Sequence, residues 1–241
     1  MIGAIPPNST RTVKASLTRK TNRTGMLMQV FEAGPAATNG YLVADREHGR
    51  SLVIDAPLGT AAAMVKQARQ WNAPIQCFVN THAHWDHLLD NAELRRLTGA
   101  PFGLHRDGVP LLELPQTQWF GLDIEMPACR PEMFLEEGRP LQVGDLRFEI
   151  LECPGHCPGS VALFEPTARV VFTGDVLFAG AIGRTDLPGG DYATLLRAIR
   201  QKLLPLGDDV RVFAGHGPAT TIGRERRQNP FLTGRGSVSG L

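Results

Sequence analysis

The chain has 241 residues, of which 42% are apolar and 20% charged, values typical of a folded globular protein with a substantial core. No apolar run approaches the roughly 18 residues that a membrane-spanning helix needs. Lys and Arg number 25 against 24 Asp and Glu, so no basic field exists to attract a nucleic-acid backbone. We therefore expect no membrane partner and no nucleic-acid partner.

In chain order, residues 1–27 come first and are predicted to be a disordered extension, because hydrophobic periodicity is weak there. The first 31 residues contain five basic residues and no acidic residue. Residues 28–232 alternate short β-branched runs with helical patterns, which predicts one mixed α/β domain. Residues 233–241 are rich in Gly and Ser and are predicted to be a flexible tail.

Within the domain, apolar runs predict strands at residues 40–44, 51–54, 75–79, 102–104, 146–151, 161–164, 169–172 and 210–213. Helical periodicity predicts helices at residues 60–71, 90–98 and 192–203. Residues 106–139 are dense in Pro, Gly and acidic residues, which predicts a loop-rich cap.

The most informative segment is the sequence THAHWDH at residues 81–87, directly after a predicted strand. It places three imidazoles and a carboxylate within six residues. His82 and His84, spaced i and i+2, can face one metal ion, while Asp86 and His87 suit a second ion. The alternative is a solvated polar loop, which fits a single histidine better than this cluster.

Three further residues follow predicted strands, namely His156 in PGHCPG, Asp175 in TGD and His216 in GHG. Each has a glycine beside it, which allows a tight loop to aim the side chain inward. Because loops at strand ends collect on one rim of a layered α/β protein, we expect these residues to converge with the histidine cluster.

Taken in order, these motifs resemble the metallo-β-lactamase fold superfamily over about residues 28–232. The resemblance implies an α/β fold, a four-layer αββα sandwich of two mixed β-sheets flanked by helices. It also implies two divalent metal ions, for which we expect zinc, with iron or manganese as alternatives. The implied ligands are His82, His84 and His156 for one ion, Asp86, His87 and His216 for the other, and Asp175 as a bridge.

The segment GRTD at residues 183–186 and the ending at residues 217–231 resemble the short glyoxalase II-like branch, whose members are hydroxyacylglutathione hydrolase-like. This resemblance implies a small-molecule thioester substrate, whose carbonyl is attacked by a metal-bridging hydroxide that Asp86 orients. Only 25 residues follow His216, too few for the helical domain with which full-length glyoxalase II enzymes hold glutathione. Glutathione recognition therefore stays open, as does the choice between a monomer and a homodimer.

Four more residues are candidates outside the ligand set. Asp55 follows a predicted strand and would either support a ligating histidine or cap a turn. Arg184, Tyr192 and Arg224 offer donors suited to a substrate carboxylate, with surface ion pairing or packing as the alternative.

Several other functions compete with thioester hydrolysis. A persulfide dioxygenase, from a related branch, would use one ferrous ion at His82, His156 and Asp175. A lactonase would use the same two ions, with Tyr192 near the leaving alkoxide. Asp175 argues against a true β-lactamase, because zinc β-lactamases lack that bridging carboxylate, and a non-catalytic protein would lack one or more ligands.

The four cysteines are too few and too irregularly spaced for a disulfide scaffold, and no apolar signal-peptide core precedes the domain. We therefore expect a cytoplasmic protein, with organelle import through residues 1–25 as the alternative.

Overall fold

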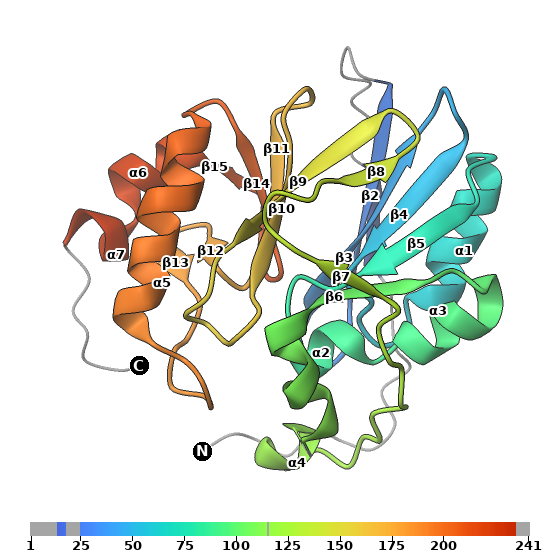
Figure 1. Cartoon of the computed structure of the whole chain (residues 1–241), viewed down its shortest axis with the longest axis horizontal. Coiled ribbons are helices and arrows are strands. Elements are labelled where there is room, and N and C mark those ends of the chain that lie inside the picture. The colour runs from blue at the N-terminus through green and yellow to red at the C-terminus, as the bar shows by residue number, and fades with distance from the viewer. Residues whose placement is uncertain (1–13, 18–24, 115, 235–241) are drawn as a thin grey trace.

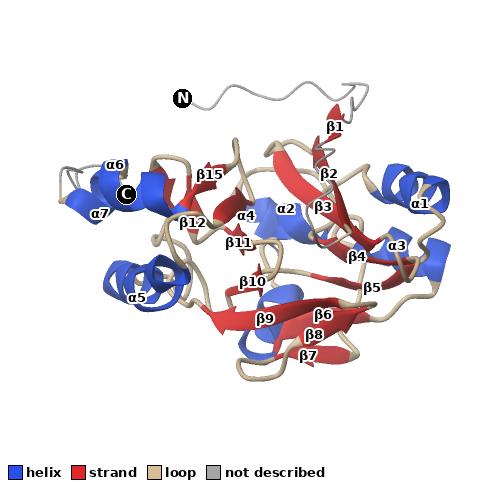
Figure 2. Cartoon of the chain, turned by 90° about the horizontal axis from the view of Figure 1, so that it is seen from above, coloured by secondary structure: helices blue, strands red, loops and turns tan. Residues whose placement is uncertain are grey.

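The computed structural model describes residues 14–17, 25–114 and 116–234. Two mixed β-sheets lie face to face, and helices cover the outer face of each (Figure 1). Seen from above, α1 and α3 lie outside one sheet, and α5 and α6 lie outside the other (Figure 2). This arrangement confirms the predicted four-layer αββα sandwich.

The first sheet has the strand order β1-β2-β3-β4-β5-β6-β7. Its strands are β1 (Lys14–Leu17), β2 (Met26–Ala33), β3 (Thr38–Asp45), β4 (Arg50–Ile54), β5 (Ile75–Val79), β6 (Phe102–His105) and β7 (Met133–Leu135). Strands β1 to β4 pair antiparallel, and β4 to β7 pair parallel. The connections carry α1 (Ala61–Gln70), α2 (Trp85–Leu88), α3 (Asn91–Thr98), the 3-10 helix η1 (Arg106–Glu113) and α4 (Gln116–Trp119).

The second sheet has the strand order β15-β14-β11-β10-β9-β8. Its strands are β8 (Leu141–Val143), β9 (Leu146–Glu152), β10 (Val161–Glu165), β11 (Val170–Gly174), β14 (Arg211–Ala214) and β15 (Thr220–Thr221). Only β11 and β14 pair parallel among these described strands. The remaining elements are β12 (Leu177–Phe178), β13 (Ala181–Ile182), α5 (Tyr192–Ala198), the π-helix η2 (Ile199–Leu203), the 3-10 helix η3 (Leu204–Leu206), α6 (Ile222–Gln228) and α7 (Pro230–Thr233).

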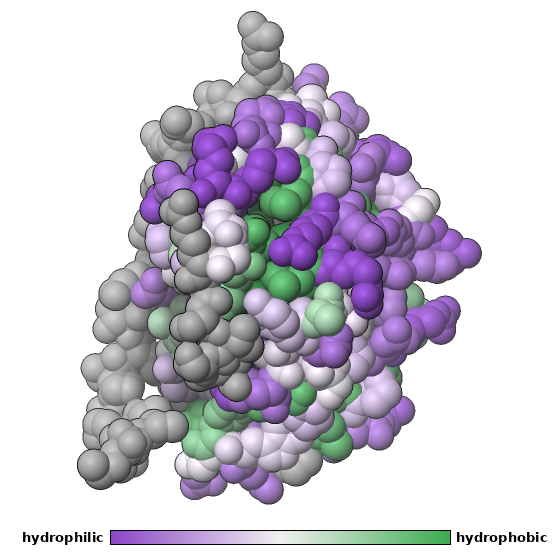
Figure 3. All heavy atoms as spheres, turned by 90° about the vertical axis from the view of Figure 1, so that its left-hand side faces the viewer, coloured by the Kyte–Doolittle hydropathy of each residue, from purple (hydrophilic) through white to green (hydrophobic). Residues whose placement is uncertain are grey.

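The layers follow from the alternation of side chains along the strands. On β10, Val161 and Leu163 face the core between the sheets, whereas Ala162 and Phe164 face the outer core beneath α5 and η2. A third core lies between the first sheet and α1 with α3. Figure 3 shows the side of the molecule near α5, α6 and α7, where an apolar recess is ringed by hydrophilic residues.

Two sequence predictions differ from the structure. Part of the expected disordered extension, residues 14–17 and 26–27, lies in β1 and β2, because residues 14–17 pair with β2 and residues 26–27 pair with β3. The rest of that extension and residues 235–241 of the tail lie outside the described residues. The predicted helix at residues 192–203 divides into α5 and the π-helix η2.

Among the described helices, none has the length and apolar character to cross a membrane.

Candidate metal centre

The seven predicted ligand residues come from five places in the fold. His82 and His84 follow β5, and Asp86 and His87 lie on the short helix α2. His156 lies between β9 and β10, Asp175 follows β11, and His216 follows β14. Their ligand atoms form three overlapping groups whose members lie within 4.8 Å of one another. These groups are His82, His84 and His156; His82, His87 and Asp175; and Asp86, His87 and His216.

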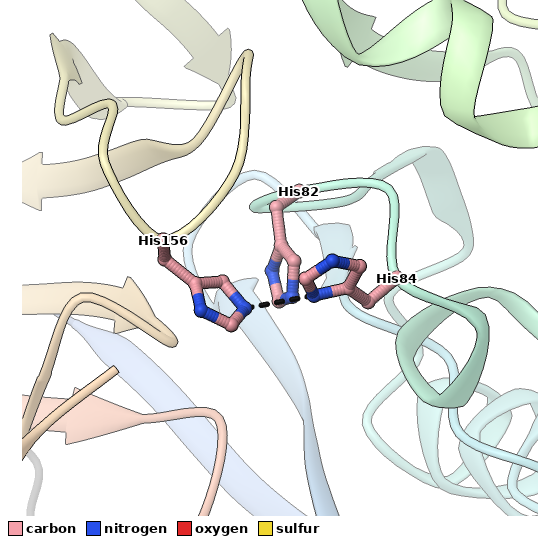
Figure 4. Close-up of side chains that lie close together, drawn as sticks. All are labelled: His82, His84 and His156. Carbon is pink, nitrogen blue, oxygen red and sulfur yellow. Dashed lines mark hydrogen bonds between the residues drawn. The ribbon is translucent and has the colours of Figure 1, made fainter. Parts of the chain in front are cut away.

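The first group consists of three imidazoles that point at one another (Figure 4). His84 Nδ1 lies 2.7 Å from His156 Nε2. The ring centroid of His82 lies 4.8 Å from that of His84 and 4.9 Å from that of His156. All three side chains are buried. Below, this group is called the three-histidine group.

The third of these groups, Asp86, His87 and His216, is called the mixed group. His216 Nε2 lies 3.3 Å from Asp86 Oδ2, and His87 Nε2 lies 3.4 Å from the same oxygen. Asp175 faces both groups, because its Oδ2 lies 3.4 Å from His216 Nε2 and 3.7 Å from His156 Nε2. Its Oδ1 lies 3.4 Å from His87 Nε2. Asp175 thus stands where a carboxylate shared by two cations would stand.

Hydrogen bonds at Nδ1 orient three of the imidazoles. His156 Nδ1 donates to the Arg184 carbonyl at 2.7 Å, and His87 Nδ1 donates to Asp55 Oδ2 at 2.9 Å. The Thr81 hydroxyl donates to Asp55 Oδ2 at 2.9 Å, so at 3.1 Å it accepts from His82 Nδ1. Each bond places a proton on Nδ1 and directs Nε2 into the centre.

Asp55 hydrogen-bonds to His87, one of the predicted ligand residues. This contact corresponds to the first of the two roles that the sequence left open, supporting a ligating histidine or capping a turn. Asp55 is buried at the end of β4, and besides His87 it accepts bonds from Thr81 N at 2.8 Å and Asn80 Nδ2 at 3.3 Å. Its φ of 59° lies in the left-handed region, which Asp tolerates better than most residues. One carboxylate therefore fixes both the loop after β5 and the ring of His87.

Contacts from β3 hold the loop that carries His216, and sequence reasoning missed them. Asn39 Nδ2 donates to the carbonyls of Ala214 at 3.1 Å and Gly217 at 2.9 Å, on either side of the ligand. Tyr41 Oη donates to the Ala214 carbonyl at 2.6 Å. Thr38 Oγ1 donates to Asp86 Oδ2 at 2.5 Å. No pattern in the sequence links the start of β3 to these loops, because the link is created by sheet packing.

The two groups have opposite protonation tendencies. Burial, followed by repulsion from His156, lowers the pKa of His84 to about 3. Burial also lowers the pKa of His216, but hydrogen bonds to Asp175 and Asp86 outweigh it and raise that pKa to about 10. Burial raises the pKa of Asp86, yet the charge of His87 and the bond to His216 bring it down to about 2. The three-histidine group is thus neutral at neutral pH, and the mixed group carries imidazolium and carboxylate charges.

The residues present fit divalent metal ions. His82 Nε2, His87 Nε2 and Asp175 Oδ1 are buried and have no hydrogen-bond partner, an arrangement that costs free energy unless another group satisfies these atoms. His84 Nδ1 and His156 Nε2 face each other, although His156 keeps its proton on the other ring nitrogen. Imidazole nitrogens with carboxylate oxygens are the donor set of zinc, iron and manganese sites. An ion in each group would satisfy these atoms.

We expect zinc binding to release protons from the mixed group. At about pH 7, His216 and His87 carry protons, since the pKa of His216 is raised to about 10 and that of His87 well above its usual value. A ligand must be deprotonated, so proton release should accompany binding, and zinc affinity should rise with pH. Titration of the metal-free protein with zinc in weak buffer would measure the number of protons released. His216→Ala should release fewer protons and His84→Ala as many as wild type; equal release from both variants would contradict the assignment.

The three candidate substrate contacts lie at different places. The carbonyl of Arg184 touches His156, but its guanidinium forms a two-bond ion pair with Asp186. Tyr192 begins α5, beside the His156 loop, because Asp191 N donates to the Gly155 carbonyl at 2.8 Å. Its ring packs against the outer core. Arg224 is exposed on α6.

The cap contributes an aromatic ring beside Trp85 and Arg184. The sequence analysis did not identify this ring. Phe120, directly after α4, is 39% exposed and lies 5.9 Å from the buried ring of Trp85 between their centroids. The Arg184 guanidinium lies 5.9 Å from the centre of the Phe120 ring. The cap and the Arg184 loop therefore meet beside the three-histidine group.

The family model described as "Metallo-beta-lactamase superfamily" matches residues 33–216 of this chain. The chain belongs to the metallo-beta-lactamase superfamily. Among superfamily members, "Hydroxyacylglutathione hydrolase GloC" of Haemophilus influenzae is 41% identical over 214 residues, which cover 87% of this chain and 100% of the relative. These matches confirm the resemblance inferred from the motifs.

Three solved structures are similar to this chain in both fold and sequence. The BLEG-1 B3 metallo-beta-lactamase is 35% identical, with a TM-score of 0.79 over 86% of this chain and 100% of that one. TTHA1623 in a di-iron-bound form is 37% identical, with a TM-score of 0.74 over 83% and 97%. ETHE1 from Myxococcus xanthus is 25% identical, with a TM-score of 0.74 over 86% and 85%.

Proposed function

We propose that this superfamily member is a metal-dependent hydrolase that cleaves a small hydroxyacyl-glutathione-like thioester. The observation that carries the proposal is the pair of adjacent ligand groups with Asp175 between them. The chain is also similar over its relative's full length to a hydroxyacylglutathione hydrolase. Two ions are proposed, zinc first and iron or manganese as alternatives, and the di-iron-bound relative supports a dinuclear centre.

When bound, the ions would polarise the thioester carbonyl and make a water molecule more acidic. The chain itself supplies the orientation. The bonds at Nδ1 of His82, His87 and His156 aim their Nε2 lone pairs inward. Asp86 is ionised at neutral pH and is fixed by Thr38. Its carboxylate is therefore placed to accept a hydrogen bond from the attacking water and to orient it. A thiolate leaves readily because a thiol has a pKa of about 8.5, so no general acid is required.

Phe120 is proposed to contact the substrate at the mouth of the centre. Phe120→Ala should raise KM about tenfold and leave kcat unchanged, because burying an aromatic face contributes roughly 1.5–3 kcal/mol of binding. Steady-state kinetics would show this split. Phe134→Ala is the matched control, since Phe134 is 38% exposed and lies under Arg106 on β7. A similar rise in KM in the control would argue against a specific contact.

The likeness to ETHE1 from Myxococcus xanthus lends some support to the alternative function, a persulfide dioxygenase. That reaction is proposed to need one ferrous ion at His82, His156 and Asp175. The mixed group would then have no ligand role, although its atoms converge as closely as those of the three-histidine group. This convergence is the reason for preferring the hydrolase.

One experiment distinguishes these functions. Purified protein would be assayed for metal content, for hydrolysis of a hydroxyacyl-glutathione thioester and for oxygen uptake with glutathione persulfide. A chromogenic β-lactam belongs in the same series because of the likeness to BLEG-1. We expect two ions per chain and thioester turnover. Oxygen uptake with one iron per chain, or turnover of the β-lactam alone, would overturn the proposal.

A further inference from the structure

The cap contains a buried amide that contacts the loop of metal ligands. Gln116, the first residue of α4, has no exposed surface. Its Nε2 donates to the carbonyls of Ala83 at 2.8 Å and Leu111 at 2.7 Å. Its Oε1 accepts from Trp85 N at 3.2 Å. The side chain thus binds the peptide groups immediately before and immediately after His84.

These two bonds fix the backbone from which the His84 imidazole projects. His84 is the residue before α2, with an extended backbone at φ −79° and ψ 145°, and the helical turn begins at Trp85. The carbonyl of Ala83 belongs to the peptide that determines φ of His84, and the N–H of Trp85 to the one that determines ψ. By holding both peptides, Gln116 restrains the direction in which Nδ1 faces His156.

Four of the other predicted ligands have different supports. His82 and His87 are held through Thr81 and Asp55, and His156 through the Arg184 carbonyl. Asp86 is held by Thr38. The ring of His84 contacts only another predicted ligand through Nδ1, His156 at 2.7 Å, and its buried Nε2 has no hydrogen-bond partner. Its orientation therefore depends on its backbone and on packing. Loss of Gln116 should therefore affect His84 more than any other ligand.

We infer that Gln116 is a positioning residue for His84 and determines the metal affinity of the three-histidine group, but not that of the mixed group. The inference rests on the metal centre proposed above and is independent of the substrate. Residues that orient metal ligands typically contribute 10- to 100-fold, as an order of magnitude, to metal affinity. Because the same segment carries Phe120, the mouth of the centre and the orientation of His84 belong to one packed unit.

The test is zinc titration of the metal-free protein against a chelating dye, with two variants. Gln116→Ala removes all three hydrogen bonds, and Gln116→Met removes them while keeping the side-chain volume. Both should weaken one zinc equivalent about 10- to 100-fold and leave the other unchanged. The methionine variant keeps the test valid if the alanine variant fails to fold. Thermal unfolding of the metal-free proteins reports the purely structural cost.

Asn229→Ala is the matched control. Asn229 is also fully buried and also makes three hydrogen bonds, to the Ala181 carbonyl, Glu225 and Phe231 N, far along the chain from the ligand loop. It should lose thermal stability and keep both zinc affinities. Equal loss of zinc affinity in Asn229→Ala and the Gln116 variants would overturn the inference, because the effect would then be general destabilisation.

Double variants assign the weakened equivalent to a ligand group. With His216→Ala, the three-histidine group stays complete, and adding Gln116→Met should weaken the remaining zinc. With His84→Ala, the mixed group stays complete, and adding Gln116→Met should change nothing. The reverse pattern, or unchanged zinc binding in Gln116→Met, overturns the inference alone. Wild-type protein that binds no zinc, iron or manganese would overturn the proposed function as well.

Discussion

Asp175→Asn is expected to lower kcat/KM for the thioester by about 10³-fold, because metal-ion catalysis contributes several kcal/mol and each 1.36 kcal/mol is about tenfold. Asp175 is the carboxylate that faces both ligand groups. Asparagine keeps its size and removes the charge that holds two cations close together. Steady-state kinetics and metal analysis would show lost activity and fewer than two ions per chain.

Glu225→Gln is the control for removing a buried carboxylate. Glu225 is 1% exposed and accepts bonds from Gly180 N, Thr220 Oγ1 and Asn229 Nδ2, outside the metal centre. This variant should lose stability and keep its metal. An Asp175→Asn protein with two tightly held ions and wild-type turnover would show that Asp175 does not bridge the groups.

Gly215→Ala is expected to disrupt the centre although it adds a single methyl group. A Cβ on Gly215 would lie 2.6 Å from His87 Cε1 and closer still to Asp175 Oδ1. His87 is buried and fixed by its hydrogen bond to Asp55, and the Asp175 Oδ1 atom is itself buried, so these two side chains must move. Zinc affinity should fall at least about a hundredfold, comparable to the largest effects of disturbed ligand orientation, as measured with the same dye titration.

Gly108→Ala provides the comparison for the glycine prediction. A Cβ at Gly108 would meet Ala83 and Leu104 at 3.4 Å, an ordinary contact. This variant should keep its zinc affinity. Unimpaired zinc binding by Gly215→Ala would mean that the loop after β14 relaxes without moving Asp175 or His87. The close approach of Gly215 to these side chains would then not be required for metal binding.

The sequence predicted some elements well and others poorly, for reasons that the pairing explains. The strand at residues 75–79 was predicted with the observed bounds, because an apolar run ends at polar Asn80. Strand β2 was missed, since it begins inside the basic, weakly periodic extension and is defined by eight pairs with β3. The helix at residues 192–203 was predicted in place, but apolar spacing did not separate α5 from the π-helix η2.

The sequence by itself determined which side chains can form the centre. Four imidazole and carboxylate residues lie together after one strand, and three more each follow a strand beside a glycine; this density is typical of metal sites, and the order of the residues in the chain identified the superfamily. Only the tertiary structure decided how they are held. Thr38, Asn39 and Gln116 lie far in sequence from the ligand-bearing segments that they contact. Only the packing of β3 and of the cap brings them together. The direction of each lone pair depends on these contacts, and contacts between distant segments leave no local pattern in a single sequence.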